Sequence, residues 1–239
     1  MSIPAPTNLP VPIVALDVPT LDDAKRLVAQ LGAPTDYYKV GLQLFVREGP
    51  PVVQWLRGEG KKVFLDLKLH DIPNTVRGAA ASAAALGADL LTVHAVGGDE
   101  MLRAAVDGAA EGGGEMSVLG VTVLTSFDDA SYSTSIGVER LRVAEAVIGF
   151  AQRARVSGAR GVVCAGAEVG AVRAVCGVDF GTLVPGIRTT GGAKHDQART
   201  STPAAVRAAG ATWVILGRTV TAAADPALAY AEIVRSLMG

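Results

Sequence analysis

Short runs of β-branched and apolar residues alternate with amphipathic or alanine-rich stretches along almost the whole chain. An apolar run of this length, bounded by turn residues, is typical of a buried strand, whereas a longer amphipathic stretch is typical of a helix. The pattern predicts eight strands, at 13–17, 36–40, 62–67, 90–94, 118–124, 161–164, 182–185 and 213–216. Helices are predicted between them, among others at 20–31, 75–86, 139–157 and 203–209.

Residues with strong positional preferences mark the ends of these helices. Thr20 and Thr202 stand where a hydroxyl can cap the first turn, and Pro203 suits the first helical position. Glycines stand where helices should stop, because glycine adopts the left-handed conformation that ends many helices. These glycines are Gly32, Gly87, Gly158 and Gly210.

Eight strands alternating with helices predict a parallel α/β fold. A (β/α)8 barrel takes about 250 residues, and this chain has 239. A doubly wound open sheet usually has a glycine-rich turn after its first strand, but here that strand ends in Leu16-Asp17-Val18-Pro19. We therefore expect one TIM barrel domain over 13–239, preceded by an extended proline-rich lead-in at 1–12.

Composition narrows the functional classes. Lys and Arg number 22 and Asp and Glu number 23, giving a net charge of −1, which argues against a nucleic-acid-binding domain. A hydrophobic fraction of 49% is enough to build a core. No targeting segment or apolar stretch of membrane-spanning length is visible. Two cysteines, without zinc-ligand spacing, predict a reducing compartment, the cytoplasm.

Polar residues stand at the carboxyl end of most predicted strands. Active sites of parallel barrels lie at that end, so these residues predict a ligand-filled mouth. They include Asp17, Lys39, Asp66, Lys68, His94, Thr125, Ser126, Arg188 and Arg218.

The third strand carries the strongest candidate for chemistry. Asp66 and Lys68 are two residues apart, so both side chains point to the same side of the strand. Lys39 and Asp71 are the expected partners, and the four charges sum to zero. Such a set can hold an ammonium group as an acid beside a carboxylate. The alternative is a structural salt-bridge network under the barrel rim.

A phosphate site is predicted after the last two strands. The connection that follows strand seven, residues 189–201, is long and glycine-rich, and Gly217-Arg218 follows strand eight. In this fold, those two loops and a helix N-terminus often bind phosphate. The alternative is a tight turn with a surface arginine.

Taken together, these motifs resemble bacterial-type orotidine 5′-phosphate decarboxylases over essentially the whole chain. The residues that carry the resemblance are Ala15-Leu16-Asp17-Val18-Pro19, Tyr38-Lys39-Val40-Gly41, Asp66-Leu67-Lys68-Leu69-His70-Asp71-Ile72-Pro73-Asn74-Thr75-Val76, Thr92-Val93-His94-Ala95, Val121-Thr122-Val123-Leu124-Thr125-Ser126, Val184-Pro185-Gly186-Ile187-Arg188, Asp196-Gln197-Ala198-Arg199 and Leu216-Gly217-Arg218.

The resemblance implies a homodimeric (β/α)8 barrel that converts orotidine 5′-phosphate to UMP and CO2 without metal or organic cofactor, as the last step of de novo UMP synthesis. It implies that Lys68 protonates C6, that Asp66 faces the departing carboxylate, and that Lys39 completes the charged array and contacts the ribose.

The other implied roles concern substrate binding and the dimer. Asp71 and Thr75 would reach into the partner subunit's site. The remaining substrate-binding positions are Asp17 for the ribose, Thr125 and Ser126 for the pyrimidine, Arg188, Gln197, Gly217 and Arg218 for the phosphate, and Ile72 and Pro185. No nucleic acid or membrane partner is implied.

The sequence is also compatible with two other functions. Related magnesium-dependent phosphosugar enzymes, such as 3-keto-gulonate 6-phosphate decarboxylases and hexulose phosphate synthases, share an Asp-x-Lys-x-x-Asp motif but have an acidic residue where Lys39 stands. The other hypothesis is a barrel that binds a nucleotide without catalysing a reaction. His94 is interpreted as a buried structural residue, and His70 should point away from the site if its strand stays regular.

Overall fold

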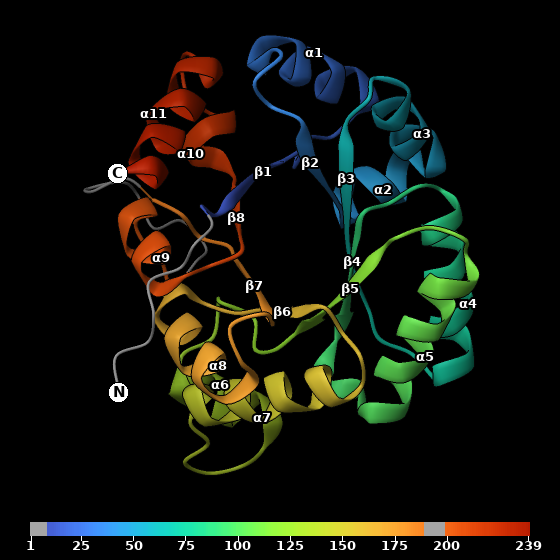
Figure 1. Ribbon diagram of the computed structural model, residues 1–239, viewed down its shortest axis with the longest axis vertical. Coiled ribbons are helices and arrows are strands. Elements are labelled where there is room, and N and C mark those ends of the chain that lie inside the picture. The colour runs from blue at the N-terminus through green and yellow to red at the C-terminus, as the bar shows by residue number, and fades with distance from the viewer. Residues whose placement is uncertain (1–8, 189–198) are drawn as a thin grey trace.

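The computed structural model describes residues 9–188 and 199–239. Eight parallel strands form a closed barrel in the order β1 to β8, and β8 pairs with β1. Figure 1 shows the strands in the centre of the molecule and the helices arranged around them. The predicted (β/α)8 barrel is therefore confirmed.

The strands lie close to their predicted positions. β4 and β8 match the prediction, whereas β1 begins at Val11, so that Val11 and Pro12 belong to the barrel and not to a lead-in. Residues 1–8 of that lead-in lie outside the described residues. The strands are β1 Val11–Ala15, β2 Tyr37–Gly41, β3 Lys62–Leu69, β4 Leu90–His94, β5 Ser117–Val121, β6 Gly161–Val163, β7 Gly181–Val184 and β8 Trp213–Leu216.

The helices follow the expected alternation, and their ends obey the expected capping chemistry. The Thr20 hydroxyl accepts a hydrogen bond from the Asp23 N–H at 3.1 Å, and Gly210 ends its helix at φ 84°. The helices are α1 Leu21–Leu31, α2 Leu42–Glu48, α3 Pro50–Gly58, α4 Pro73–Ala85, η1 Ala95–Gly97, α5 Asp99–Glu111, α6 Asp129–Ile136, α7 Val143–Val156, η2 Gly166–Glu168, α8 Val169–Cys176, α9 Pro203–Ala209, α10 Arg218–Thr221 and α11 Pro226–Met238.

The helix α6 is among those that the sequence analysis did not name. α6 has little amphipathic character, and its start is fixed by the Asp128 side chain, which accepts a hydrogen bond from the Ser131 N–H at 2.8 Å. The Ser131 hydroxyl accepts one in return from the Asp128 N–H. This reciprocal cap stabilises the helix without an apolar face.

The core has two layers. One fills the space between barrel and helices, and the other fills the barrel interior. The interior layer consists of Ile13, Ala15, Tyr37, Phe64, Leu90, Leu119, Leu183 and Ile215. Because these apolar side chains fill the barrel below its mouth, polar groups at the carboxyl ends of the strands lie on an apolar floor.

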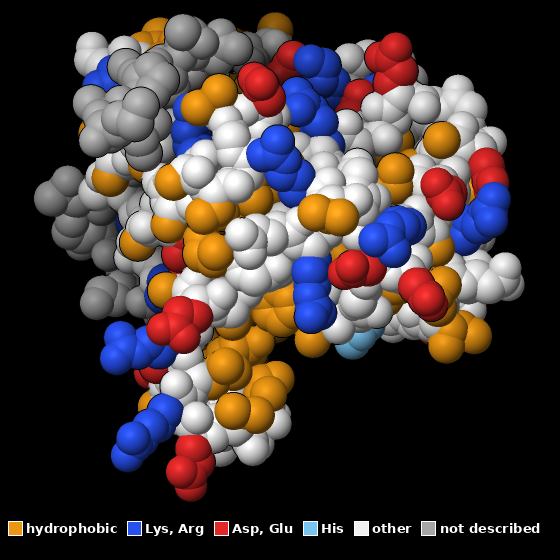
Figure 2. Space-filling view, turned by 60° about the horizontal axis from the view of Figure 1, so that its bottom comes forward, with side chains coloured by type: hydrophobic (Ala, Val, Ile, Leu, Met, Phe, Trp, Pro, Cys, Tyr) orange, Lys and Arg blue, Asp and Glu red, His pale blue; other side chains and the backbone are white. Residues whose placement is uncertain are grey.

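The surface in Figure 2 mixes Lys and Arg side chains with Asp and Glu side chains, and hydrophobic side chains gather in a hollow beside a projecting segment. The face drawn there has no region dominated by positive charge, as expected from the net charge of −1. Among the described residues, no helix has both the length and the apolar character that a membrane span needs.

Candidate active site

A cavity of about 330 Å³ opens at the carboxyl ends of the strands. Its floor includes Phe64, Leu183 and Ile215 from the interior layer of the core. Most of the residues predicted to form the site line this cavity, namely Asp17, Lys39, Asp66, Lys68, Thr125, Ser126, Pro185, Arg188, Gly217 and Arg218. The barrel therefore brings together side chains that are far apart in the sequence.

Four of these side chains form a continuous line of opposite charges. Lys39 Nζ lies 2.7 Å from Asp17 Oδ1 and 3.7 Å from Asp66 Oδ2. Lys68 Nζ lies 2.8 Å from each of the two Asp66 carboxylate oxygens. The Lys39 side chain is 9% exposed and that of Asp66 is 14% exposed, so two charges at the centre of the line are largely removed from water. Pairing is what makes such burial tolerable.

Within one subunit, this line differs in one member from the set expected from the sequence. Asp71 was expected to complete the charged set, but it is exposed, and among the described residues its carboxylate forms no ion pair. It accepts instead a hydrogen bond from the Ile72 N–H at 2.6 Å. The chain leaves β3 at Leu69, before Asp71 can turn back to the barrel mouth. Asp17 is the fourth member of the line within one subunit, so that this set of four charges is neutral.

The charge state of Asp66 follows from these contacts. Burial alone would raise the pKa of this carboxyl, because it disfavours the charged form. The ammonium groups of Lys39 and Lys68, with hydrogen bonds from Lys68 and Thr92, outweigh burial and hold the pKa of Asp66 below its ordinary value. At neutral pH the cavity therefore holds a carboxylate with an ammonium group on either side.

The backbone at Lys68 departs from a regular strand. Its φ is 49°, in the left-handed region that non-glycine residues rarely adopt. The pairing of β3 with β4 shifts register between Leu65 and Leu69, around this residue. The Lys68 N–H donates to the hydroxyl of Thr92, on β4, at 3.0 Å. Asp66 and Lys68 do share one side, as predicted, but through a bulge and not through simple alternation.

Gly41 leaves room for the Lys39 ammonium at the end of β2. A Cβ atom at this position would lie 2.9 Å from Lys39 Nζ and 3.2 Å from Asp17 Oδ1. Any larger residue would therefore force the Lys39 ammonium away from its present position beside Asp17. Gly41 belongs to the Tyr38-Lys39-Val40-Gly41 motif, and the structure gives a steric reason for its presence.

The opposite side of the cavity carries the predicted phosphate-binding residues. Arg188 follows β7 and is 9% exposed, and its Nη1 donates to the Ile187 carbonyl at 2.8 Å. The Thr219 hydroxyl, in the first turn of α10, donates to the same carbonyl at 3.1 Å. This contact links the end of β7 to the helix that begins at Arg218. Gln197 lies outside the described residues.

A buried ion pair that the sequence analysis did not predict links the loops after β5, β6 and β7. The Glu168 carboxylate contacts the Arg199 guanidinium and also accepts a hydrogen bond from the Ala165 N–H at 2.8 Å. Arg199 Nη2 donates to the carbonyl oxygens of Val123 and Leu124 at 3.1 and 3.2 Å. Burial raises the pKa of Glu168, and Arg199 opposes that shift. The pair fixes the chain just before Thr125.

His70 and His94 lie beside the site but do not line its cavity. His94 is half-buried, and the rings of His94 and His70 lie with their centroids 5.7 Å apart. Burial, followed by the nearby His70 and Lys68, lowers the pKa of His94, so that it is neutral at pH 7. His70 is exposed. Neither residue is placed to act on a molecule in the cavity.

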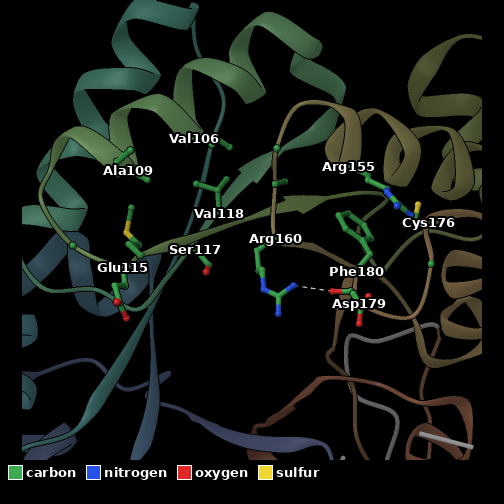
Figure 3. Close-up of a pocket in the computed structure, with 16 residues that line it drawn as sticks. Val106, Ala109, Glu115, Ser117, Val118, Arg155, Arg160, Cys176, Asp179 and Phe180 are labelled. Carbon is green, nitrogen blue, oxygen red and sulfur yellow. Dashed lines mark hydrogen bonds between the residues drawn. The ribbon is translucent and has the colours of Figure 1, made fainter. Parts of the chain in front are cut away.

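A second cavity, of about 520 Å³, lies at the amino ends of the strands (Figure 3). Val118 and Phe180 contribute apolar surface to it, and Arg160 donates a hydrogen bond to the Asp179 carbonyl at 2.7 Å. Cys176 lines this cavity too, but burial raises the pKa of its thiol, which opposes thiolate formation. None of the predicted site residues lies here.

Comparisons with known proteins agree with this geometry. Residues 10–233 match the model of the family described as "Orotidine 5'-phosphate decarboxylase / HUMPS family". The chain is 42% identical to an orotidine 5′-phosphate decarboxylase of Bacillus cereus, over 92% of this chain and 94% of that protein. It is 50% identical to one of Anaeromyxobacter dehalogenans, over 93% and 96%.

A solved structure is similar as well. The crystal structure of orotidine 5′-phosphate decarboxylase from Lactobacillus acidophilus superposes with a TM-score of 0.86 at 38% identity. The match covers 97% of this chain and all of that one. The shared fold therefore extends over the whole barrel.

Proposed function

The chain belongs to the orotidine 5′-phosphate decarboxylase / HUMPS family, and from this we propose that Lys68 is the proton donor in its reaction. The activity is decarboxylation of orotidine 5′-phosphate to UMP in pyrimidine biosynthesis, the activity named for its relatives at 42–50% identity over most of the chain.

One observation supports the proposal most directly: the Lys68 ammonium lies at the cavity, held by both oxygens of Asp66 at 2.8 Å. When CO2 leaves, its bonding electrons stay on C6 of the pyrimidine. A fixed ammonium beside that carbon stabilises the developing charge. The N–H bond of Lys68 then breaks as the C6–H bond forms, leaving a neutral amine that solvent reprotonates.

Asp66 and Lys39 set the electrostatics around that step. We propose that the Asp66 carboxylate faces the carboxylate of the substrate, so that departure of CO2 relieves a contact between like charges. Lys39, 3.7 Å from Asp66, limits the cost of keeping that carboxylate ionised in a largely buried place. Its other partner, Asp17, is more exposed and suits a contact with the ribose.

The other residues at the carboxyl ends of the strands are proposed to bind the substrate. We propose that Thr125 and Ser126 contact the pyrimidine, and that Arg188, Gln197, Gly217 and Arg218 bind the phosphate. Pro185 lines the cavity and completes these contacts, whereas Ile72, also expected to bind substrate, is exposed outside the cavity of its own subunit. Guanidinium groups suit a phosphate dianion because they donate two parallel hydrogen bonds. Binding energy from a phosphate remote from C6 can then help to reach the transition state.

The charges around Asp66 favour this reaction over the magnesium-dependent chemistry of related phosphosugar enzymes. Asp66 has ammonium groups at 2.8 and 3.7 Å, so two cations already compensate its charge. Lys39 stands where those enzymes, by resemblance, have an acidic residue. A further divalent cation beside these two would meet repulsion from both.

The activity is tested by following the ultraviolet absorbance of orotidine 5′-phosphate in excess EDTA, with CO2 release measured in parallel. We expect full turnover, because the proposed positive charge comes from lysine. Loss of turnover in EDTA with recovery on adding Mg²⁺ would contradict the metal-free mechanism. No turnover under either condition would favour a nucleotide-binding barrel without catalysis.

The role of Lys68 is tested separately with Lys68→Ala. We expect turnover to be abolished while UMP still binds, because the phosphate and pyrimidine contacts are unchanged. Isothermal titration with UMP checks the binding. A near-normal rate in this variant would overturn the role of Lys68 as proton donor, whatever the fate of the activity itself.

We further propose that the chain works as a homodimer through the face around the carboxyl ends of β2, β3 and β4. Apolar side chains are exposed after each of these neighbouring strands: Leu42 and Val46 in α2, Ile72 before α4, and Val96 in η1. Val46 is 79% and Ile72 is 67% exposed. Burying such a surface in a partner subunit would stabilise a dimer.

Asp71 and Thr75 lie on this same face, are exposed, and do not line the cavity of their own subunit. In a symmetric dimer they could complete the partner's site. Asp71→Ala and Lys39→Ala subunits, each inactive alone, should recover about one quarter of wild-type activity when mixed, because half of the dimers are mixed and each has one intact site. No recovery in verified heterodimers would contradict a shared site.

The expected compartment is the cytoplasm. Both cysteines, Cys164 and Cys176, are free and buried. Free thiols are consistent with a reducing compartment. Localisation of a tagged chain by fractionation tests this expectation, and recovery with exported proteins would contradict it.

A further inference from the structure

The hydroxyl of Thr92 lies at the junction of the two residues that the proposed reaction uses most. Thr92 is in the middle of β4 and is completely buried. Its Oγ1 accepts a hydrogen bond from the Lys68 N–H at 3.0 Å and donates one to Asp66 Oδ1 at 2.9 Å. The direction of both bonds is fixed, because an N–H can only donate and a carboxylate can only accept.

These bonds form a closed ring. The Lys68 backbone donates to Thr92, Thr92 donates to Asp66, and Asp66 Oδ1 accepts a further bond from Lys68 Nζ at 2.8 Å. A lysine that is fixed at both its backbone and its ammonium has little freedom to rotate away. Chains of hydrogen bonds of this kind act together and hold their members in a single arrangement.

The backbone at Lys68 needs this support. Besides Arg140, Lys68 is the one non-glycine residue in the described part of the chain with a positive φ. Such a conformation persists only where surrounding contacts impose it. Here the register shift between β3 and β4 turns the Lys68 N–H toward a side chain of β4, and the Thr92 hydroxyl is the group that accepts it.

We propose that Thr92 is a positioning residue, whose hydroxyl fixes the left-handed backbone of Lys68 and the orientation of the Asp66 carboxylate together. This inference rests on the proposed role of Lys68 as proton donor. Thr92 is buried and does not line the cavity, so its effect on the reaction passes through its two neighbours.

Thr92→Val tests the proposal, because valine has nearly the same shape and lacks only the hydroxyl. Thr92→Ser is the matched control, since it keeps the hydroxyl and loses a methyl group. We expect Thr92→Val to lower kcat by roughly 10–100-fold, the scale of a misplaced catalytic group, with KM changed much less. The kcat of Thr92→Ser should stay within about threefold of the wild-type value, since serine keeps both hydrogen bonds of the hydroxyl.

A pH profile gives a second readout that a purely structural role would not move. The bond from Thr92 favours the ionised form of Asp66, so its removal raises the pKa of that carboxyl. The acid limb of kcat should therefore move to higher pH in Thr92→Val and stay in place in Thr92→Ser. If Thr92→Val is poorly folded, the pair Thr92→Ala and Thr92→Ser isolates the hydroxyl in the same way.

The outcomes separate this inference from the one it rests on. If Lys68→Ala is inactive and Thr92→Val retains the wild-type kcat and pH profile, the positioning role of Thr92 is wrong and the role of Lys68 stands. Equal damage in the serine and valine variants would also overturn it, because the methyl group would then be what matters. Activity in Lys68→Ala would show that Lys68 is not the proton donor, and the inference about Thr92 would then lose its basis.

Discussion

Each end of the barrel has a cavity, and the two cavities differ in how their charged groups are held. At the carboxyl end, Lys39 and Asp66 are largely buried, and every member of their line has an opposite charge beside it. At the amino end, Arg155 and Asp179 are exposed, and neither forms an ion pair within the described residues.

The cavity at the amino end is nevertheless the larger, at about 520 Å³ against about 330 Å³. Size therefore does not identify the active site in this molecule. Removing charges from water costs free energy, and a fold that keeps them buried and paired at one place holds a field ready for a reaction. Exposed charges around an apolar gap have no comparable effect.

Asp66→Asn should have the largest effect on the difference between the two cavities, because it leaves the ammonium groups of Lys39 and Lys68 at the carboxyl end without their shared partner. We expect kcat to fall by roughly 10³-fold and the free energy of unfolding to fall by about 3–5 kcal/mol, the usual cost of breaking a buried pair. Steady-state kinetics and urea unfolding measure the two effects.

Asp179→Asn is the control at the other cavity and should change neither quantity. An Asp66→Asn variant as stable as wild type would show that the line of charges is not a stabilising unit in the folded protein. A loss of activity in Asp179→Asn would mean that the amino-end cavity is connected to function.

Phe180→Ala should separate stability from activity at the amino end. Phe180 is 7% exposed and forms part of the wall of that cavity. Truncating a buried phenylalanine typically costs about 3–5 kcal/mol, so we expect a lower thermal midpoint. The rate per folded molecule should stay unchanged, which active-site titration can establish. A drop in kcat at full folding would contradict a purely structural role.

Arg218→Ala should act on one part of the substrate only. We expect kcat/KM for orotidine 5′-phosphate to fall by roughly 10²-fold, the scale of charge-assisted hydrogen bonds, while the slow reaction of the nucleoside orotidine is unaffected. Arg155→Ala, at the amino-end cavity, is the matched control and should behave as wild type. Equal losses for nucleotide and nucleoside would exclude the phosphate role.

The smallest expected effect is a dependence of stability on acid pH. Because the folded pKa of Asp66 lies below its unfolded value near 4, its stabilising contribution is complete above that value and is lost as pH falls through the folded pKa. Each unit of pKa depression corresponds to about 1.4 kcal/mol. Urea unfolding between pH 7 and pH 3 should show Asp66→Asn losing less stability than wild type.

Much of this arrangement could be predicted from the sequence, for identifiable reasons. Alternation along the chain predicted the eight strands. Asp66 and Lys68 do lie on the mouth side as their spacing of two suggested, although a bulge at Lys68, which no local pattern revealed, is what places them there. These inferences work because strand periodicity is a local property of the backbone. Because active sites of parallel barrels lie at the carboxyl ends of the strands, residues distant in sequence, such as Lys39 and Arg188, could be assigned to one site.

The parts that could not be predicted depend on where the chain turns in three dimensions. Asp71 is close to Lys68 in sequence, yet the strand ends at Leu69 and the chain carries Asp71 to the surface. Asp17, remote in sequence, is the actual partner of Lys39. The Glu168–Arg199 contact joins loops that no local pattern relates.

The register shift in β3 has a consequence for how this barrel tolerates insertions and deletions. Before the shift, Leu65 pairs with Leu91, and after it Leu69 pairs with Val93, so β3 spends two more residues than β4 over the same stretch. Deleting two residues between Leu65 and Leu69 would allow an uninterrupted hydrogen-bond ladder between β3 and β4 and a more regular strand. The Lys68 ammonium would then move away from Asp66. We therefore expect that insertions or deletions in this segment are not tolerated in any variant that keeps the reaction.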